Sequence, residues 1–484
     1  MAAAEQVSFL IIGAGFSGLG AAIRLTRSGH TDLVVLERAD DVGGTWRHNT
    51  YPGCRCDVQS NLYSYSFEPK PDWSETFPSQ PELWEYLRAV TRKHRLERYL
   101  RFGHEVTGAR WDAVAGRWQV ATSKGEFSAR YLVAGVGALV EPSLPDIPGI
   151  ESYAGTVMHS AQWDHSWNAA GRRVAVVGTG ASAIQIVPAI QPQVEHLTVF
   201  QRTAPYVVPH TNHAVRPAIR TLYRAVPGMQ RLSRALIYWM REMLVFGFVK
   251  NPKILRRAEA AWRRHMESAV TDHATRAQLT PTYRLGCKRV LPSNDYYPAI
   301  AKPNVSLVTE KVIEFRPDAV ITADGEEHKA DTVVLATGFH VTDHPMLAKI
   351  TGSDGRSLAE AFGTTYLGTV VPGFPNFFHL TGANTGLGHS SMVFMIESQL
   401  AYIADGVAKA EAAGGRFEVR PEVAAAYNAE LQRKLPRTVW GSGCSSWYLD
   451  SQGRNLTLWP GFTFDYRRRT REFAPADFRL GWGQ

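Results

Sequence analysis

Two glycine-rich turns constrain the fold of this chain more than any other sequence feature. The first, Gly13-x-Gly-x-x-Gly18, lies between the apolar, strand-like run 7–12 and the helix-like run 19–27. The second, Gly178-x-Gly-x-x-Ala183, follows the strand-like run 173–177 and opens another helix-like run. Such turns let the backbone approach a pyrophosphate, and the helix N-terminus adds partial positive charge. The sequence therefore predicts an α/β fold with two Rossmann-like dinucleotide-binding domains.

The residues that end the second strand of each unit differ between the two units. In the first unit Glu37 follows the strand-like run 33–36, where a carboxylate can accept a hydrogen bond from a ribose hydroxyl. In the second unit Arg202 and Thr203 follow the run 197–200. These side chains can bind a ribose 2′-phosphate, which an acid would repel. The pattern predicts FAD or NAD in the first unit and NADP in the second.

A chain of 484 residues is too long for one ordinary hydrophobic core, and its helix-prone, Arg-rich run 217–273 interrupts the second unit. We therefore expect a helical insert at 209–280. The FAD-binding domain would comprise 1–148 and 344–484, which includes the C-terminal tail, and the NADP-binding domain would comprise 149–208 and 281–343. Further expected elements are helices at 81–94 and 391–409, a hairpin within 111–133, and strands at 304–308, 312–315, 319–322 and 332–335.

Composition excludes several classes of function. The chain has a net charge of +8, but its Lys and Arg form no long run interleaved with aromatics, which disfavours nucleic-acid binding. Its N-terminus shows no signal-peptide pattern. The most apolar run, 235–249, contains Arg241 and Glu242 and is shorter than the roughly 20 residues of a transmembrane helix. The four cysteines do not form a disulfide framework, so we expect inert, reduced thiols in a cytoplasmic protein.

Two nucleotide units without a metal-binding motif point to electron transfer from a nicotinamide to a flavin. We expect no bound metal, because no Cys-x-x-Cys pair is present, and no acyl-transfer chemistry, because no Gly-x-Ser-x-Gly turn is present. Flavin disulfide reductases share the two-unit layout, but they need a redox pair of cysteines separated by several residues. Cys54 and Cys56 are too close in sequence to match that pair.

A stretch between the two units carries a family resemblance. It reads Tyr153-x-Gly155-x-x-x-His159-x-x-x-Trp163-Asp164. This pattern resembles the fingerprint of type I Baeyer–Villiger monooxygenases, a class of flavoprotein monooxygenases in which Phe is usual where Tyr153 stands. The related monooxygenases that oxidise nitrogen and sulfur tend to lack the Trp. The resemblance covers nearly the whole chain: both glycine turns, Gly43-Gly-Thr-Trp46, Tyr51-Pro-Gly-x-x-x-Asp57, Lys288-Arg289, the turn Ala336-Thr-Gly338, and Trp440.

The resemblance implies an NADPH- and FAD-dependent monooxygenase. In that family NADPH reduces FAD, and the reduced flavin reacts with O2 to give a flavin C4a-peroxide. The peroxide attacks a small-molecule ketone, and rearrangement gives an ester or lactone while NADP+ stays bound. The cofactor carries the difficult chemistry, whereas the protein positions it and supplies charge.

The resemblance also implies roles for individual residues. Arg289 would be the catalytic cation that stabilises anionic intermediates, and Asp57 would orient it. Lys288 would bind the 2′-phosphate together with Arg202 and Thr203. Trp46 and Trp440 would line the site, and the segments 295–297 and 384–388 would lie near it. The inter-domain fingerprint, Gly155, His159, Trp163 and Asp164, would order the contact between domains. The other expected cofactor-binding residues are Gly13, Gly15, Phe16, Ser17, Gly18, Glu37, Arg38, Gly44, Thr45, Asp57, Gly178, Thr179, Gly180, Ser182, Ala183, Thr337 and Gly338.

Alternatives remain open at the level of sequence. Arg289 and Asp57 could form an ordinary ion pair, the two tryptophans could be core residues, and His159 could be purely structural. One alternative function is a flavin-containing monooxygenase that oxidises nitrogen or sulfur in small molecules. Another, of a different class, is a non-catalytic or redox-sensing flavoprotein that binds both nucleotides.

Overall fold

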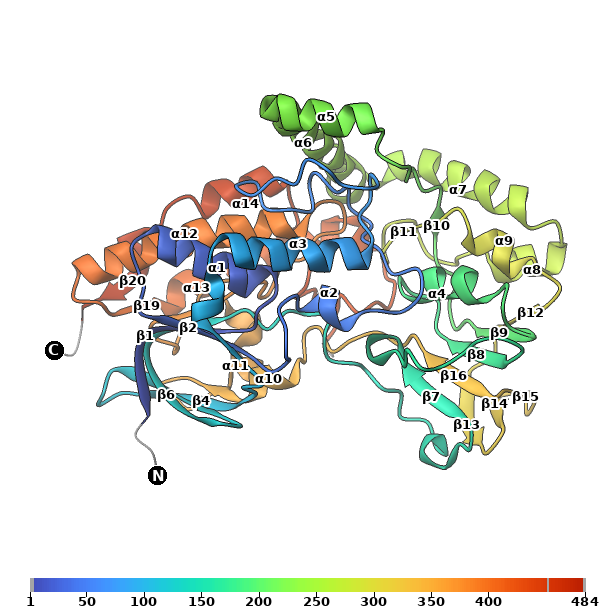
Figure 1. Ribbon diagram of the computed structural model, residues 1–484, viewed down its shortest axis with the longest axis horizontal. Helices are drawn as coiled ribbons and strands as arrows, with labels where there is room; N and C mark the ends of the chain where they lie inside the picture. Colours follow the sequence, from blue (N-terminus) through green and yellow to red (C-terminus); the bar gives the residue numbers. More distant parts are fainter. Residues whose placement is uncertain (1–3, 451, 482–484) are drawn as a thin grey trace.

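The computed structural model describes residues 4–450 and 452–481, which form two β-sheets with helices packed around them (Figure 1). The first sheet has eight strands in the order β17-β4-β5-β6-β1-β2-β3, and β18 also pairs with β6. Its strands come from both ends of the described chain: β1 (Glu5–Ile12), β2 (Leu33–Glu37), β3 (Leu100–Phe102), β4 (Val106–Asp112), β5 (Arg117–Thr122), β6 (Gly125–Ala134), β17 (Ile350–Thr351) and β18 (Phe377–His379).

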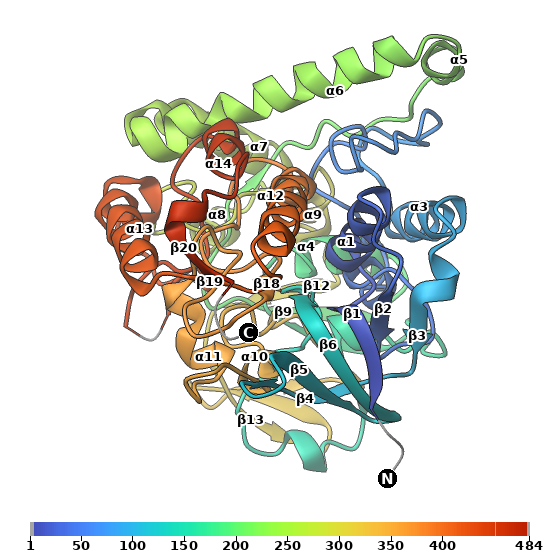
Figure 2. The same cartoon turned by 90° about the vertical axis from the view of Figure 1, so that its left-hand side faces the viewer.

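Strand β1 lies in the middle of this sheet, parallel to β2 on one side and to β6 on the other. Its side chains from Phe9 to Ile12 are buried, as expected for a parallel strand covered on both faces. Helices α1 (Phe16–Arg27) and α12 (Met392–Ala412) lie side by side on the sheet (Figure 2). They approach so closely that a Cβ on Gly20 would lie 2.6 Å from Leu400. The C-terminal third therefore completes the first nucleotide unit.

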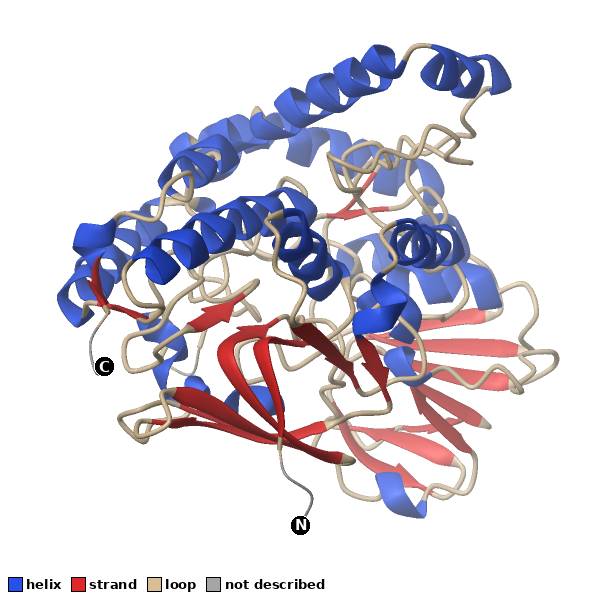
Figure 3. Ribbon diagram, turned by 60° about the vertical axis from the view of Figure 1, so that its left-hand side comes forward, coloured by secondary structure: helices blue, strands red, loops and turns tan. Residues whose placement is uncertain are grey.

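The second sheet is entirely parallel, with the order β12-β9-β8-β16-β7. It lies beside the first sheet, as the secondary-structure colouring of Figure 3 shows. Helix α4 (Ala183–Ile190) follows its glycine turn, and a small antiparallel sheet adjoins it. These strands are β7 (Thr156–His159), β8 (Arg173–Val177), β9 (His196–Phe200), β12 (Val305–Val308) and β16 (Thr332–Leu335), then β13 (Val312–Arg316), β14 (Ala319–Thr322) and β15 (Glu327–Lys329).

The remaining elements flank these sheets. The run 217–278 forms four α-helices, a π-helix and the short 3-10 helix Pro252–Leu255, with α5 and α6 along the upper edge of the molecule (Figures 1 and 2). They are α5 (Pro217–Ala225), α6 (Pro227–Glu242), the π-helix Phe246–Lys250, α7 (Arg256–Ala269) and α8 (His273–Gln278). Elsewhere lie α2 (Thr45–His48), α3 (Gln80–Lys93), α9 (Tyr296–Ile300), α10 (Pro345–Ala348), α11 (Leu358–Ala361), α13 (Pro421–Lys434), α14 (Thr463–Arg469), β10 (Val207–Val208), β11 (Leu291–Pro292), β19 (Phe417–Val419) and β20 (Phe478–Leu480).

Two connections link the sheets, and they pair with each other. The outgoing segment after β6 meets the returning segment after β16: the Ser143 amide donates to the Gly338 carbonyl over 2.9 Å, and the Thr337 hydroxyl donates to the Ser143 carbonyl over 2.6 Å. The His340 amide also donates to the Glu141 carbonyl over 3.0 Å. Within the described residues, no helix is both long and apolar enough to cross a membrane.

Candidate active site

One cavity of about 1160 Å³ runs between the two sheets and is lined by both glycine turns. It is larger than the pockets of roughly 300–1,000 Å³ that usually hold one small ligand. The segments that contain Trp46, Asp57, Arg289 and Gly338 also line it. The cavity therefore brings together segments from both ends and the middle of the chain.

The first glycine turn is built for close contact between backbone segments. Gly13 has a φ of +95°, and a Cβ at this position would lie 2.6 Å from the Gly135 carbonyl oxygen. A Cβ on Gly18 would lie 1.7 Å from the Gly13 carbonyl oxygen, so Gly18 sits behind the cavity wall and allows helix α1 to pack closely on the turn. The Glu37 carboxylate is buried at the end of β2 and accepts hydrogen bonds from the amides of Ala14 (2.8 Å) and Ala39 (2.9 Å).

The second turn has the same backbone shape, but basic side chains lie near it where the first turn has an acidic one. Gly178 has a φ of +112°, and a Cβ there would lie 2.5 Å from the Ala336 carbonyl oxygen. Past the end of β9, Arg202 and Thr203 line the cavity together with Lys288. Burial and the nearby charge of Arg202 both lower the pKa of Lys288. Two cations that repel each other at a cavity wall suit a phosphate group, whose charge would relieve the repulsion.

Arg289 and Asp57 form an ion pair at the cavity wall, although 232 positions separate them in sequence. The Arg289 Nε donates to Asp57 Oδ2 over 3.1 Å, and Nη2 donates to the same oxygen. Burial is the largest single influence and raises the pKa of Asp57, but the charge and hydrogen bonding of Arg289 and the charge of Arg241 together hold that pKa below its ordinary value. The Asp57 charge in turn raises the pKa of Arg289. Arg289 Nη1 also donates to the Leu387 carbonyl over 3.2 Å, which fixes the plane of the guanidinium.

A second arginine supports this pair, although no local sequence pattern indicated it. Arg241, at the end of α6 in the helical insert, donates from Nη2 to the Asp57 carbonyl over 2.8 Å and from Nε to Gln59 Oε1 over 2.8 Å. Tyr448 also lies close enough for the charges of Arg289 and Asp57 to influence its pKa, which burial raises to about 12. The helical insert and the C-terminal tail therefore both reach the Arg289–Asp57 pair.

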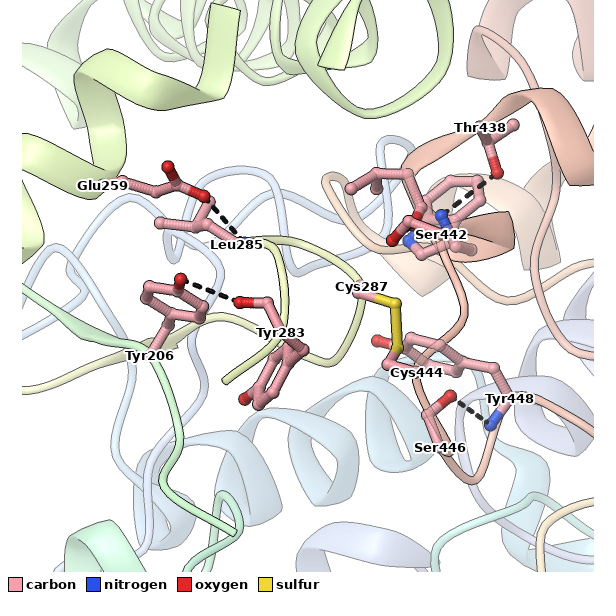
Figure 4. Close-up of a disulfide and its surroundings, with 12 residues drawn as sticks. Tyr206, Glu259, Tyr283, Leu285, Cys287, Thr438, Ser442, Cys444, Ser446 and Tyr448 are labelled. Carbon is pink, nitrogen blue, oxygen red and sulfur yellow. Dashed lines mark hydrogen bonds between the residues drawn. A yellow bond between two sulfur atoms is a disulfide. The ribbon is translucent and has the colours of Figure 1, made fainter. Parts of the chain in front are cut away.

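The prediction that all four cysteines are reduced thiols is wrong for two of them. Cys287 and Cys444 form a disulfide that joins the segment before Arg289 to the C-terminal tail (Figure 4). The sequence could not indicate this pairing because 157 positions separate the two residues. Cys54 and Cys56 are unpaired and buried, and burial raises the pKa of Cys54 to about 12, so both stay protonated thiols.

The two predicted tryptophans occupy different places. Trp46 lines the cavity, whereas Trp440 is buried behind its wall, where a Cβ on Gly388 would meet its ring at 3.1 Å. The Thr438 hydroxyl accepts the Trp440 amide and caps the short turn that directs this indole inward. Trp447, in the loop beyond the disulfide, lines the cavity instead and is 47% exposed.

The inter-domain fingerprint forms the edge of the second sheet and does not line the cavity. A Cβ on Gly155 would lie 2.3 Å from the Asp331 carbonyl oxygen, so glycine permits the close pairing of β7 with β16. His159 Nδ1 accepts the Ala161 amide over 3.1 Å, and its ring packs edge-on against Phe339 in the returning connection. Trp163 packs on Trp167, and Asp164 accepts the amide and hydroxyl of Ser166. Burial lowers the pKa of His159 to about 4, which argues for a neutral, structural ring.

The other expected residues divide into two groups. Tyr296 and Tyr297 are buried in α9 and do not line the cavity; Tyr297 accepts a hydrogen bond from Trp262 over 2.7 Å. Ala183 likewise lies behind the wall, at the start of α4. The expected residues not yet described that do line the cavity are Gly15, Phe16, Ser17, Arg38, Gly44, Thr45, Thr179, Gly180, Ser182 and Thr337, joined by Thr385, Gly386 and Leu387 of the 384–388 segment.

Comparisons with known proteins agree with this geometry. The model of the flavin-binding monooxygenase-like family matches residues 6–353. A Baeyer-Villiger monooxygenase of Streptomyces coelicolor is 49% identical over 482 residues, which is 98% of this chain and 93% of that protein. One from Pseudomonas aeruginosa is 42% identical and covers 99% of this chain and 92% of its own length.

Solved structures resemble the whole fold. A closed crystal structure of cyclohexanone monooxygenase has a TM-score of 0.88 at 29% identity and covers 99% of both chains. An oxidised steroid monooxygenase bound to NADP has a TM-score of 0.86 at 31% identity, covering 99% of this chain and all of that one. The α/β fold with two dinucleotide-binding units is thereby confirmed. The chain belongs to the Baeyer–Villiger monooxygenases, within the flavin-binding monooxygenase-like family.

Proposed function

We propose that this chain inserts one oxygen atom of O2 beside the carbonyl of a small-molecule ketone, giving an ester or lactone, with Arg289 as its catalytic cation. Membership of the Baeyer–Villiger monooxygenases supports the reaction type. The observation that carries the role of Arg289 is its ion pair with Asp57 at the wall of a cavity shared by both glycine turns.

The residues fit the two cofactors of the family, FAD and NADPH. Gly13, Gly15 and Glu37 would hold the FAD, because the backbone at this turn can approach a pyrophosphate and the carboxylate ends β2. Gly178 and the Arg202–Lys288 cations would hold the NADPH through its pyrophosphate and 2′-phosphate. Together the bound cofactors supply the electrons and the activated oxygen.

Arg289 has the features that oxygenation of a ketone requires of a protein side chain. Nucleophilic attack on a carbonyl places negative charge on its oxygen, and a permanently charged guanidinium stabilises that charge without giving up a proton. Asp57 and the Leu387 carbonyl fix the guanidinium plane from two sides. Arg241 holds the Asp57 backbone, so the orientation of Arg289 depends on the helical insert.

The partners and location follow the same proposal. Ketone and O2 are the small-molecule partners, and no nucleic acid takes part. We place the protein in the cytoplasm, where NADPH is available as reductant. Cell fractionation with an antibody against the chain tests the location: recovery mainly from an extracellular fraction would contradict it.

The function is tested by analysing products from the FAD-loaded protein, NADPH and O2. A panel of cyclic and linear ketones should give esters or lactones, each carrying one oxygen atom from labelled O2. Formation of only sulfoxides or N-oxides, from sulfide and amine substrates offered in parallel, would identify a heteroatom oxygenase instead. Binding of both nucleotides without any oxygenated product would favour a non-catalytic or redox-sensing flavoprotein.

A further inference from the structure

Helix α6 turns most of its large apolar side chains toward solvent, which is unusual for a helix packed on a protein. Surface helices usually turn their apolar stripe toward the core. On α6 and the residue after it, the apolar stripe faces solvent, and its side chains are exposed by 38% (Met229) to 62% (Met243). The spacing of these residues keeps them on one helix face. We call them the apolar stripe: Met229, Leu232, Leu236, Trp239, Met240 and Met243.

The opposite face of α6 is mostly polar: Ile237 and Tyr238 pack against the core, and hydrogen bonds from the polar residues fix the helix to the body of the protein. Gln230 donates to Asn61 Oδ1 over 3.1 Å. Arg234 donates to the carbonyls of Asn61 and Ser64, each over 2.8 Å. At the end of the helix, Glu242 accepts the Thr463 amide over 2.8 Å. These hydrogen bonds fix the rotation of the helix about its axis, and this rotation directs the apolar stripe toward solvent.

The apolar surface extends beyond α6 in both directions. In α5, Ile219 and Leu222 are exposed at helical spacing, and Val226, between α5 and α6, is exposed as well. Beyond it, Phe464 of α14 packs against Trp239, with 5.9 Å between ring centroids. Leu244, Phe246 and Ile254 are also exposed. So many exposed apolar side chains on neighbouring elements mark an interaction site.

The charges beside this surface identify its partner. Within 216–257, which the structure describes in full, Glu242 is the only acidic residue, and it is buried. The exposed charged side chains of this segment are all basic: Arg216, Arg224, Arg231, Lys250, Lys253, Arg256 and Arg257. If a second copy of the chain paired through the same surface, the basic side chains of the two copies would be brought together and would repel each other. A surface of anionic lipid complements them.

We propose that α5, α6 and the segment 243–257 form a docking surface for an anionic lipid bilayer, with the apolar stripe inserted at the level of the headgroups. An amphipathic helix with a basic border binds membranes in this way, lying in the interface plane without crossing it. Trp239 has the amphipathic ring that favours the interface. Because α6 also carries Arg241, the bound membrane would lie against the element that supports Asp57.

The test is flotation of the full-length, FAD-loaded protein with vesicles of phosphatidylcholine alone or mixed with phosphatidylglycerol. The protein should float with the anionic vesicles, and added salt should weaken this binding. Leu236→Ser combined with Met240→Ser should lower the vesicle affinity at least about tenfold, because two apolar side chains no longer enter the interface. Arg231→Gln should lower it about fivefold.

Val114→Ser is the matched control, since Val114 is fully exposed in the turn between β4 and β5, strands that lie at the opposite end of the molecule from α6 (Figure 2). It should bind vesicles like the unmodified chain, and all variants should keep their flavin absorbance. The proposal is overturned if the unmodified protein binds neither type of vesicle, or if the double variant of Leu236 and Met240 binds vesicles as well as the Val114→Ser control does. It is also overturned if light scattering finds a dimer that the double variant dissociates, because a second copy then covers the stripe. Equal binding to both vesicle types would overturn the requirement for anionic lipid.

Discussion

The two nucleotide units share one backbone plan and differ in charge. Gly13 and Gly178 both have positive φ, and a Cβ on either would press on a carbonyl oxygen of the facing strand end, at 2.6 and 2.5 Å. At the end of the next strand the first unit has the buried Glu37, whose carboxylate accepts hydrogen bonds from backbone amides, whereas just past that strand the second unit has Arg202 beside Lys288. In our proposal the backbone sets where a dinucleotide lies, and one or two side chains set which dinucleotide binds.

Substituting the first glycine of each unit should have the largest effect and should separate the units. We expect Gly13→Ala to abolish FAD binding, because the new Cβ meets backbone that cannot move aside. Gly178→Ala should keep FAD but lose reduction by NADPH. Flavin absorbance and stopped-flow reduction measure the two outcomes.

Two other glycines control for backbone strain. Gly29 and Gly171 also have positive φ, but nothing lies within 4 Å of a Cβ built on them. Gly29→Ala and Gly171→Ala should therefore keep both functions, at a modest cost in stability. If Gly13→Ala and Gly178→Ala lost the same cofactor, the two units would not be specialised.

Removing the cation of the second unit should have the next largest effect. Arg202→Ala should raise KM for NADPH about thirtyfold, in line with roughly 2 kcal/mol for a charged hydrogen bond. KM for NADH should change little, since NADH has no 2′-phosphate. Steady-state kinetics with both nucleotides measure this difference. An equal rise for both would argue against 2′-phosphate binding at Arg202.

The acid of the first unit should matter less. Glu37→Gln keeps a side chain of the same size but removes the charge and one of the two acceptors used by the amides of Ala14 and Ala39. FAD affinity should fall about tenfold, which corresponds to about 1.4 kcal/mol. Titration of the FAD-free protein with FAD measures it. An unchanged FAD affinity, or a change in NADPH affinity instead, would contradict the assignment of Glu37 to FAD binding in the first unit.

A smaller effect, on stability, concerns the edge of the second sheet. Burial lowers the pKa of His159 to about 4, so the folded protein keeps this ring neutral. The unfolded chain binds a proton below about pH 6.5, and the stability contributed by the neutral ring is lost as the pH falls from there toward 4. The loss should be roughly 1 kcal/mol at pH 6. His159→Gln should remove this share of the pH dependence in urea unfolding, whereas an unchanged slope would show that His159 does not titrate as described.

Local patterns predicted much of this molecule. Strand, turn and helix follow one another within about thirty residues in each unit, so the sequence revealed both glycine turns, Glu37 and Arg202. The predicted helix at 81–94 corresponds to α3, Gln80–Lys93, and the predicted strand 173–177 to β8. By contrast, β7 lies within the fingerprint and β18 has only three residues, too short for a periodic signal.

What the sequence could not reveal depends on contacts between distant segments. The Cys287–Cys444 disulfide and the bonds from Arg241 to the Asp57 carbonyl and Gln59 join parts of the chain that only the fold brings together. The same holds for Trp440 and Trp447, because a turn of the tail decides which indole reaches the cavity. The outward direction of the α6 stripe likewise depends on hydrogen bonds to distant segments, so only the structure shows which face of this helix points inward.

The central claim is that Arg289 catalyses oxygenation of the ketone after the flavin has been reduced. Its most direct test compares Arg289→Ala with Arg469→Ala, whose arginine is equally exposed, at 32%, and pairs with Glu430 away from the cavity. The account predicts that both variants are reduced by NADPH at similar rates, and that only Arg289→Ala loses ester formation, by about a thousandfold or more. Ester formation by Arg289→Ala at the rate of the Arg469→Ala control would contradict it.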